Sequence, residues 1–340
     1  MRRSRSDGRV VWRTGGRIAL VAALAAGPPV RLSAQDLPLN SGALFLVFPV
    51  GATAVGMGQA ALAADGTGDA AFWNPAGLAT ILTAEFSLHT ATLAAGRTSA
   101  VSVYVPKPGV GVLGGAVYLV DYGDLARTDS NNITIGRISP RNFEFLASFA
   151  TELSGRFVLG LNYKLIEFRV DCSGDCTDLP DGEGVTHAVD VGGQFQVGGA
   201  HGVRVGVAVR NLGFKLQVQN RDQADALPAR VALGAVYQID LKPAANAALG
   251  DRFDLRVAAD LDSPWGRAGA SEMRLGLDLG YKKLVRLRGG YAFVRDGLSG
   301  PSVGMGVTSG SIGADLARTF LTGSDLVVEN PTFFSFRVAF

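Results

Sequence analysis

The chain has 340 residues, including 45 glycines, and its mean hydropathy is +0.22. Only 18% of the residues are charged and the formal net charge is +2, with no basic patch carrying interleaved aromatic side chains, which argues against a nucleic-acid-binding protein. A glycine-rich chain with few charges and a positive hydropathy is typical of many strands and turns with extensive apolar surface.

The first 34 residues have the pattern of a secretory signal peptide. Six arginines precede the apolar run at residues 18–26, and the small residues Ser33 and Ala34 follow. The run is too short to span a bilayer as a helix, and a Gly-Pro-Pro sequence interrupts it. We therefore predict an exported protein whose mature chain begins near Gln35. The exact cleavage site stays open, because Leu32, three positions before the cut, is not small.

Residues 35–80 form a second region, which is rich in Ala and Gly and shows little alternation. Within it, Gly56, Gly58 and Ala61 superficially match a dinucleotide-binding fingerprint. No alternating strand precedes them and no βαβ pattern surrounds them, so we reject that interpretation. We expect a structural segment here, and the sequence predicts no cofactor.

Residues 81–340 alternate between apolar and polar side chains with a period of two. The pattern is strongest at 253–262 and 271–280, where one face is apolar and the other is largely charged. We expect the charged face to line a polar lumen, with these candidate lining residues: Asp254, Arg256, Asp260, Arg274 and Asp278. A soluble β-sandwich is the alternative, but it would expose these charged faces to bulk water.

Fourteen segments carry the alternation, and each is close to the roughly 9 to 11 residues that a tilted strand needs to cross an outer membrane. They are 83–93, 97–106, 111–121, 142–152, 156–170, 186–197, 203–213, 228–239, 253–262, 271–280, 285–294, 302–309, 311–320 and 332–340. A bilayer-crossing chain without long apolar helices must close its sheet to leave no edge in lipid. The sequence therefore predicts an all-β, fourteen-stranded antiparallel transmembrane barrel in the bacterial outer membrane, in contact with its lipid.

The predicted connections alternate in length, as in bacterial barrels. The long ones would face outside: 122–141, 171–185, 214–227, 263–270, 295–301 and 321–330. The short connection around Gly96 and the longer one at 241–250 break the rule. Aromatic residues at predicted strand ends are expected to form an interfacial girdle: Tyr104, Tyr122, Tyr281 and Trp265.

The chain ends on an aromatic residue within an alternating segment. Phe336, Val338 and Phe340 share one face of this segment and resemble the C-terminal signal that the barrel-assembly machinery reads. The last segment must then pair with residues 83–93 to close the ring.

The only cysteines, Cys172 and Cys176, lie in an acidic segment that we expect outside the membrane. An exported chain passes through an oxidising compartment, so a local disulfide is expected. Metal binding by the nearby carboxylates is a sharper alternative, but the spacing does not match an EF-hand. The three histidines are scattered with no triad or metal-ligand spacing. We predict neither a metal site nor an enzyme.

One run in the N-terminal region resembles a known family. Pro-Val-Gly-Ala at residues 49–52, Gly-Met-Gly at 56–58 and Trp-Asn-Pro-Ala-Gly-Leu at 73–78 are similar to the N-terminal signature of the PorV/PorQ family, relatives of the FadL fatty-acid channel. The resemblance implies a fourteen-stranded barrel with residues 35–80 folded inside as a hatch. It also implies structural roles for the following hatch residues: Pro49, Gly51, Gly56, Gly58, Asn74, Pro75 and Gly77. Asn74 and Pro75 are expected to turn the chain into the first strand.

Two functions follow from the resemblance. The first is a PorV-like accessory of type IX secretion, whose partners are secretion components and their cargo. The alternative is FadL-like passive transport of hydrophobic small molecules across the outer membrane, which requires a hydrophobic ligand. The predicted external loops look short for a fatty-acid channel, which favours the secretion role. PorV-like and PorQ-like roles, the ligand and the oligomeric state stay open.

Overall fold

The computed structural model describes residues 42–64, 66–176, 182–198, 202–217, 224–241, 253–265, 271–282, 284–294, 297–323 and 328–340. The predicted signal peptide and the first seven residues of the predicted hatch lie outside this part of the chain, as does His201. None of the helices among the described residues has the length and apolar character needed to cross a membrane.

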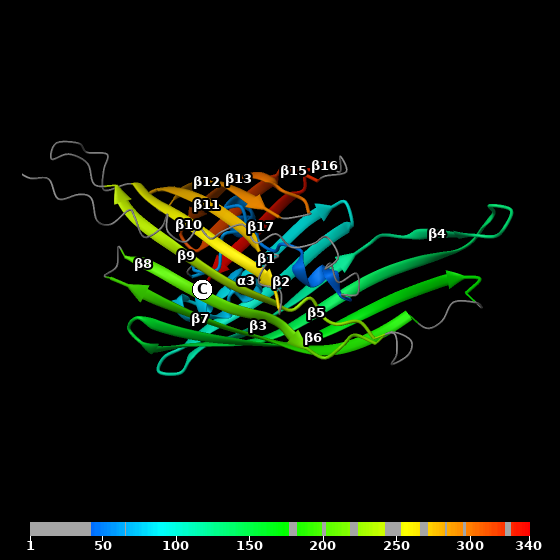
Figure 1. Ribbon diagram of the computed structural model, residues 1–340, viewed down its shortest axis with the longest axis horizontal. Helices are drawn as coiled ribbons and strands as arrows, with labels where there is room; N and C mark the ends of the chain where they lie inside the picture. Colours follow the sequence, from blue (N-terminus) through cyan, green and yellow to red (C-terminus); the bar gives the residue numbers. More distant parts are fainter. Residues whose placement is uncertain are drawn as a thin grey trace, which may run out of the picture. The chain divides into compact units, whose positions relative to one another are not determined.

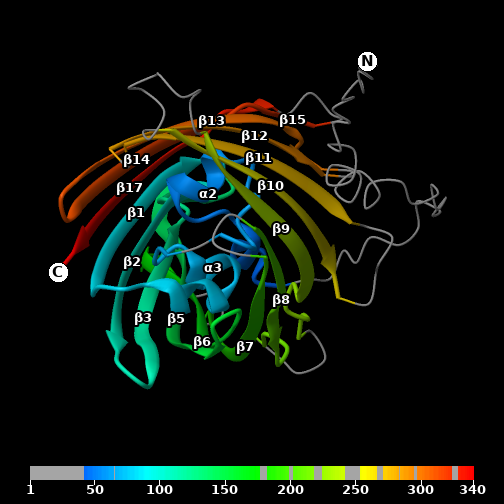
Figure 2. The same ribbon diagram turned by 90° about the vertical axis from the view of Figure 1, so that its left-hand side faces the viewer.

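Fourteen antiparallel strands close into a barrel (Figures 1 and 2). They are β1 Glu85–Leu93, β2 Gly96–Lys107, β3 Gly111–Asp121, β5 Thr134–Ser154, β6 Phe157–Gly174, β7 Gly182–Val197, β8 Val203–Gly213, β9 Arg230–Leu241, β10 Phe253–Pro264, β11 Glu272–Tyr281, β12 Val285–Phe293, β13 Gly300–Ser309, β14 Ile312–Thr319 and β17 Thr332–Ala339. Each of the fourteen predicted segments corresponds to one strand. The ring closes where β17 pairs with β14 on one side and with β1 on the other, with Phe336 opposite Leu88. The predicted pairing of first and last strands is confirmed.

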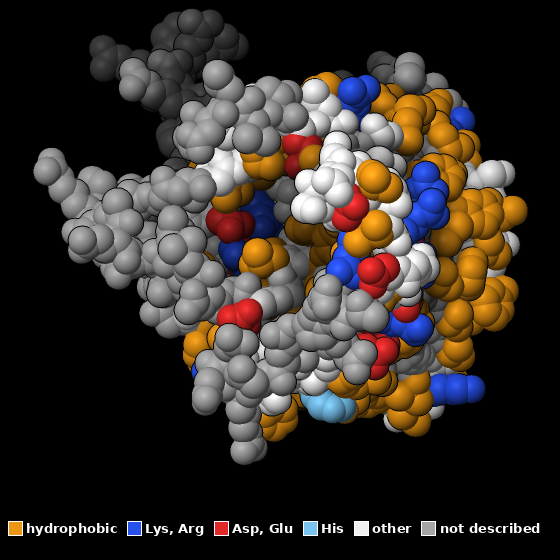
Figure 3. All heavy atoms as spheres, turned by 90° about the vertical axis from the view of Figure 1, so that its right-hand side faces the viewer, with side chains coloured by type: hydrophobic (Ala, Val, Ile, Leu, Met, Phe, Trp, Pro, Cys, Tyr) orange, Lys and Arg blue, Asp and Glu red, His pale blue; other side chains and the backbone are white. Residues whose placement is uncertain are grey.

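The wall of the barrel has an apolar outer face and a mixed inner face. On the outside, Leu277, Leu287 and Val303 are each about half exposed, and Figure 3 shows hydrophobic side chains gathered on this wall. On the inside of β1, Ser87, His89 and Ala91 alternate as buried residues. Exposed apolar side chains over a whole sheet are stable only against lipid, since a soluble sandwich would bury them.

Part of the predicted external loop 122–141 is in fact strand. It contains β4 Leu125–Thr128, and β5 already begins at Thr134, with a turn in which Asp129 Oδ1 accepts hydrogen bonds from the backbone N–H groups of Asn131 and Ile133. The predicted loop 171–185 likewise holds the end of β6 and the start of β7. A ribbon with both faces in water needs no apolar alternation, so the sequence pattern could not predict it. This external ribbon extends beyond the rest of the wall in Figure 1.

A smaller two-stranded ribbon lies within the predicted loop 321–330, formed by β15 Leu321–Thr322 and β16 Val328–Glu329. The connections that were predicted to be external join their strands at one end of the barrel, which we call the long-loop end, whereas the longer connection from β9 to β10 joins its strands at the other end. The C-terminus lies at the other end, which we call the short-turn end.

Two girdle predictions are wrong. Tyr122 packs against the core cluster and its hydroxyl accepts a hydrogen bond from the buried Asn142. Tyr104 points inward and is 0% exposed, because it lies on the same face of β2 as the buried Ala100 and Ser102. Trp265, directly after β10, is 54% exposed. Strand ends alone do not show which face of the sheet a side chain occupies.

Residues 42–84, which we call the plug, lie inside the ring (Figure 2). The plug contains four short helices: η2 Leu44–Val47, α2 Ala52–Gly56, α3 Ala70–Trp73 and η3 Pro75–Thr80. Its Phe45 and Leu78 are buried in one cluster with Tyr118, Val120 and Ile166 of the wall. The barrel core is therefore a contact between plug and wall.

Glycine allows the closest approaches between plug and wall. Gly58 adopts φ +64° and lies directly against the backbone of Gly290 on β12. A Cβ on Gly290 would collide with the backbone of Met57 and Gly58. The conformation at Gly58 is one that L side chains rarely adopt, so glycine is required there for two reasons.

Candidate solute-binding cavity

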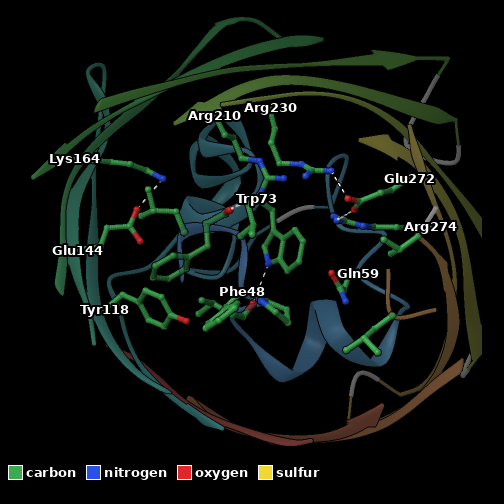
Figure 4. Close-up of a pocket in the computed structure, with 17 residues that line it drawn as sticks. Phe48, Gln59, Trp73, Tyr118, Glu144, Lys164, Arg210, Arg230, Glu272 and Arg274 are labelled. Atoms are coloured by element: carbon green, nitrogen blue, oxygen red, sulfur yellow. Dashed lines mark hydrogen bonds and ion pairs between the residues drawn. The ribbon is translucent and has the colours of Figure 1, made fainter. Parts of the chain in front are cut away.

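A cavity of about 310 Å³ lies between the plug and the wall. The plug contributes an apolar and aromatic side, which includes Leu46, Phe48, Phe72 and Trp73 (Figure 4). Val294 and Leu298, in the connection from β12 to β13, lie at its mouth. Figure 3 views the long-loop end and shows a hollow with acidic and basic side chains in its wall. The cavity is therefore reached from the long-loop end.

A buried lysine forms one polar corner of the cavity. Lys164 Nζ on β6 lies 2.8 Å from Glu144 Oε1 on β5 and 2.9 Å from Asp190 Oδ2 on β7. It also donates a hydrogen bond of 2.8 Å to Asn211 Oδ1 on β8. Asp190 lies where the register between β7 and β8 shifts, and it accepts the backbone N–H of Asn211 at 2.7 Å. The register shift thus positions Asp190, which neutralises the lysine, and Asn211, which orients it.

Three arginines form the opposite polar corner (Figure 4). Arg210 on β8, Arg230 on β9 and Arg274 on β11 lie 2.5, 2.7 and 3.3 Å from the carboxylate of Asp262 on β10. Glu272 bridges Arg230 at 2.6 Å and Arg274 at 2.7 Å. The Asp262 side chain is 2% exposed, whereas that of Glu272 is 17% exposed. The more exposed of the two acids is therefore the one that lines the cavity.

Trp73 connects the arginines to the plug. Its indole N–H donates to the carbonyl of Val50 at 2.9 Å, which fixes the ring. The guanidinium carbons of Arg210 and Arg274 each lie 5.7 Å from the ring centroid, within the range of a cation–π interaction. Arg210 also donates to the carbonyl of Phe72 at 3.1 Å. The wall arginines thus hold the aromatic side of the cavity in place.

Other wall side chains fasten the plug around the ring. These hydrogen bonds run to backbone groups of the plug: Ala52 N to Ser335 Oγ, Gly58 N to Ser302 Oγ, Leu62 N to Asp260 Oδ2, Gly68 N to Glu85 Oε1, and Asn162 Nδ2 to Ala71 O, all between 2.7 and 2.9 Å. They come from five separate strands. Within the described residues the plug is therefore held from several sides.

The predicted hatch residues mostly serve backbone packing. Gly51 adopts φ +91° and lies against Asp69, and Gly56 faces Gly304 on β13. A Cβ on Gly77 would lie 2.9 Å from Ala70 Cβ. Pro49 is the one member of the predicted set that lines the cavity.

Asn74 and Pro75 do not turn the chain directly into the first strand as predicted. Asn74 caps η3, where its Oδ1 accepts from Ala76 N at 3.1 Å, and Pro75 is the first residue of that helix. Four residues separate the end of η3 from β1. The Asn74 side chain also donates to Leu62 O at 2.8 Å, which ties two parts of the plug together. A helix of six residues leaves no periodicity from which it could be predicted.

The predicted lumen-lining residues do not form one site. Arg274 lines the cavity, and Asp260 binds the plug. Asp254 and Asp278 share Arg286 at 2.8 Å each, away from the cavity. Arg256 lies opposite Asp278 in the pairing of β10 with β11.

Sequence reasoning missed most of the polar cavity residues: Glu144, Lys164, Arg210, Arg230 and Glu272. Each lies in or at the end of a predicted strand. A charged side chain on the inner face of a strand was therefore the sequence signal by which they could have been found. Their convergence depends on five different strands, which no local pattern encodes.

The other predicted features lie outside the cavity. Cys172 and Cys176 are joined by a disulfide at the outer end of β6. No group of three or more His, Cys, Asp or Glu residues with metal-binding geometry occurs in the described ranges. Phe336 and Val338 lie on the outer face of β17, and Phe340 is 72% exposed beyond its end.

His89 forms the one Ser–His–Asp contact seen among the described histidines. Its Nδ1 lies 2.8 Å from Ser335 Oγ and its Nε2 lies 3.4 Å from Asp69 Oδ1. The void beside it has a volume of only about 10 Å³, which is room for one water at most. The contact therefore joins plug and wall in a place that a substrate cannot reach. His187 lies on the outer face against Tyr163.

No protein-family model matches the chain, and no curated protein sequence is similar to it. Solved structures are similar in fold. The monoaromatic hydrocarbon channel CymD aligns with a TM-score of 0.58 at 13% identity, over 86% of this chain and 97% of that one. The toluene transporter TodX of Pseudomonas putida aligns with a TM-score of 0.57 at 11% identity, over 85% and 98%. A FadL homologue of Pseudomonas aeruginosa gives 0.51 at 13% identity, over 85% and 98%. The chain therefore has the fold of the FadL-like barrels and is a β-barrel protein of the bacterial outer membrane.

Proposed function

We propose that this barrel admits small hydrophobic molecules through the outer membrane, by way of the cavity at its long-loop end. The observation that carries the proposal is the cavity itself, which is about 310 Å³ in volume and is lined on its plug side by Leu46, Phe48, Phe72 and Trp73. Ligand sites are concave, largely apolar and of this order of size. The neighbours described as hydrocarbon channels support the proposal through their shared fold.

The proposal reverses the preference drawn from the sequence. The resemblance to PorV and PorQ favoured a role in type IX secretion, on the argument that the external loops are short. None of the structural neighbours named above is described as a secretion component. The cavity does not depend on long loops, because the plug and the wall supply its lining. Transport of a hydrophobic solute is therefore the better supported of the two functions.

Uptake by intact cells tests the function. The chain would be expressed in a bacterial host that has a lipopolysaccharide outer leaflet and lacks a FadL-like barrel of its own. We expect radiolabelled toluene, at low concentration, to enter these cells faster than cells with an empty vector. Equal entry rates, with the barrel shown in the outer-membrane fraction by its heat-dependent gel shift, would contradict the proposal.

A further inference from the structure

We propose that the preferred ligand of the cavity is a small aromatic acid, whose carboxylate binds Arg230 and Arg274 in exchange for Glu272. This inference rests on the proposed function of the cavity as a solute site, and it names the chemical class of the solute. Two of the fold neighbours are described as a monoaromatic hydrocarbon channel and a toluene transporter. A hydrocarbon offers the polar side chains of this cavity no charged or hydrogen-bonding partner.

More basic than acidic side chains line the cavity. Four basic side chains line the cavity, namely Lys164, Arg210, Arg230 and Arg274, and two acidic ones, Glu144 and Glu272. The remaining acids that neutralise the cluster, Asp190 and Asp262, have side chains 0% and 2% exposed and do not line the cavity. Among the residues that line the cavity, basic side chains therefore outnumber acidic ones, although the whole cluster is balanced.

Two of the arginines already bind a carboxylate at the edge of the cavity. Arg230 Nη2 and Arg274 Nη2 meet at one carboxylate, with distances of 2.6 and 2.7 Å to the two oxygens of Glu272. Paired N–H groups that converge on a carboxylate are the arrangement by which arginine recognises acids. Glu272 is the first residue of β11 and the more exposed of the two acids that bind these arginines. It can leave the arginines without breaking the wall, since Asp262 still pairs with both.

Aromatic side chains of the cavity can bind the ring of the ligand. Phe48, Phe72, Trp73 and Tyr118 line the same cavity as the arginines (Figure 4). Aromatic rings prefer offset or edge contacts with other rings, and these add to the effect of apolar burial. A one-ring acid can thus place its ring among these side chains and its carboxylate on the arginines. A neutral hydrocarbon would leave the guanidinium groups with Glu272 and gain only the aromatic contacts.

Binding of benzoate and of its neutral ester, methyl benzoate, tests the inference. Equilibrium dialysis would use the purified full barrel in an uncharged detergent, with binding to empty micelles subtracted. We expect the wild-type protein to bind benzoate at least tenfold more tightly than methyl benzoate, and high salt to weaken only benzoate binding. Equal affinities for the two compounds would overturn the inference.

Two variants test the exchange in opposite directions. Glu272→Gln should tighten benzoate binding several-fold, because it removes the competing carboxylate, and Arg230→Gln should weaken it at least tenfold. Methyl benzoate binding should change less than twofold in both. Asp124→Asn on the external ribbon is the charge-matched control. A heat-dependent gel shift verifies that each variant is folded. A Glu272→Gln protein that binds benzoate no more tightly than wild type would overturn the inference.

The two proposals fail separately. Toluene entry into cells without preferential binding of benzoate would leave the transport function standing and overturn the acid preference. Benzoate binding without entry of toluene or benzoate into cells would support the ligand class and contradict transport.

Discussion

At the scale of single residues, the contact between Gly58 and Gly290 decides how closely the plug can lie against the wall. Gly290→Ala places a methyl group against the backbone of Met57 and Gly58, so the plug must shift. We expect a destabilisation of about 1–3 kcal/mol, the usual effect of overpacking a well-packed core. The measurement is the temperature at which the folded, fast-migrating gel band disappears.

Gly289→Ala is the matched control for Gly290→Ala. Gly289 precedes Gly290 on the same strand, and a Cβ there meets no atom within 4 Å. Both variants change strand propensity alike, so only contact with the plug differs between them. Equal thermal behaviour of the two variants would contradict the described packing.

Asp262 is the buried acid that three arginines of the wall share. Asp262→Asn would leave Arg230 and Arg274 with Glu272 and would take from Arg210 the carboxylate that it contacts. Removing one member of a buried charge cluster costs about 3–5 kcal/mol. We expect the variant to lose its folded gel band at a clearly lower urea concentration than wild type.

The control for Asp262→Asn is Asp124→Asn. Asp124 pairs with Arg137 on the external ribbon, where both side chains are half exposed. Exposed ion pairs contribute little to stability. Wild-type resistance to urea in the Asp262→Asn protein would show that the arginines need no buried anion.

At the scale of elements, the closing strand β17 completes the barrel, and the residue that follows it is the predicted assembly signal. Phe340 lies just beyond this strand, where its N–H donates to Ala84 O at 2.8 Å and its ring is 72% exposed. The finished barrel therefore gains little from this residue. We expect deletion of Phe340 to lower the amount of protein in the outer-membrane fraction, while the inserted molecules keep the wild-type heat-shift temperature.

The control for the Phe340 deletion is Phe214→Ala, which removes another exposed ring at the long-loop end. It should leave both quantities unchanged. Normal outer-membrane levels of the truncated protein would contradict a role of the C-terminal residue in assembly.

The strands were predictable from the sequence because lipid on one face and the barrel interior on the other select different side chains at successive positions of a strand. Lipid selects apolar residues such as Leu275 and Leu277 on one face, and charges such as Arg274 and Asp278 occupy the other, which produces a period of two. The external ribbon at β4 was not predicted, because water on both of its faces removes that pattern. The plug helices were not predicted either, since segments of four to six residues carry no helical period.

The cavity was predictable only in part. Arg274 stood out because its strand alternates strongly, and Trp73 belonged to a recognisable run. Lys164 and Arg230 lie on strands with weaker alternation, and their role depends on partners at least 20 residues away, such as Glu144 and Glu272. The pairing of neighbouring strands sets that proximity, and the positions that it brings together are known only once the register is known.

At the scale of the whole molecule, the barrel, the plug and the cavity form one arrangement. The ring gives an apolar outer wall, the plug fills the inside, and the cavity remains on the long-loop side of the plug. A solute that enters the cavity contacts the aromatic side of the plug. The central claim is therefore that solutes enter by this cavity.

The entry rate of radiolabelled toluene into cells that carry one of two tryptophan variants tests this claim most directly. Val294→Trp narrows the mouth of the cavity, whereas Val303→Trp places the same side chain on the lipid-facing wall of β13, where Val303 is 52% exposed. At equal outer-membrane levels, we predict that Val294→Trp reduces entry toward the empty-vector rate and that Val303→Trp retains the wild-type rate. Wild-type entry in the Val294→Trp cells would contradict the account.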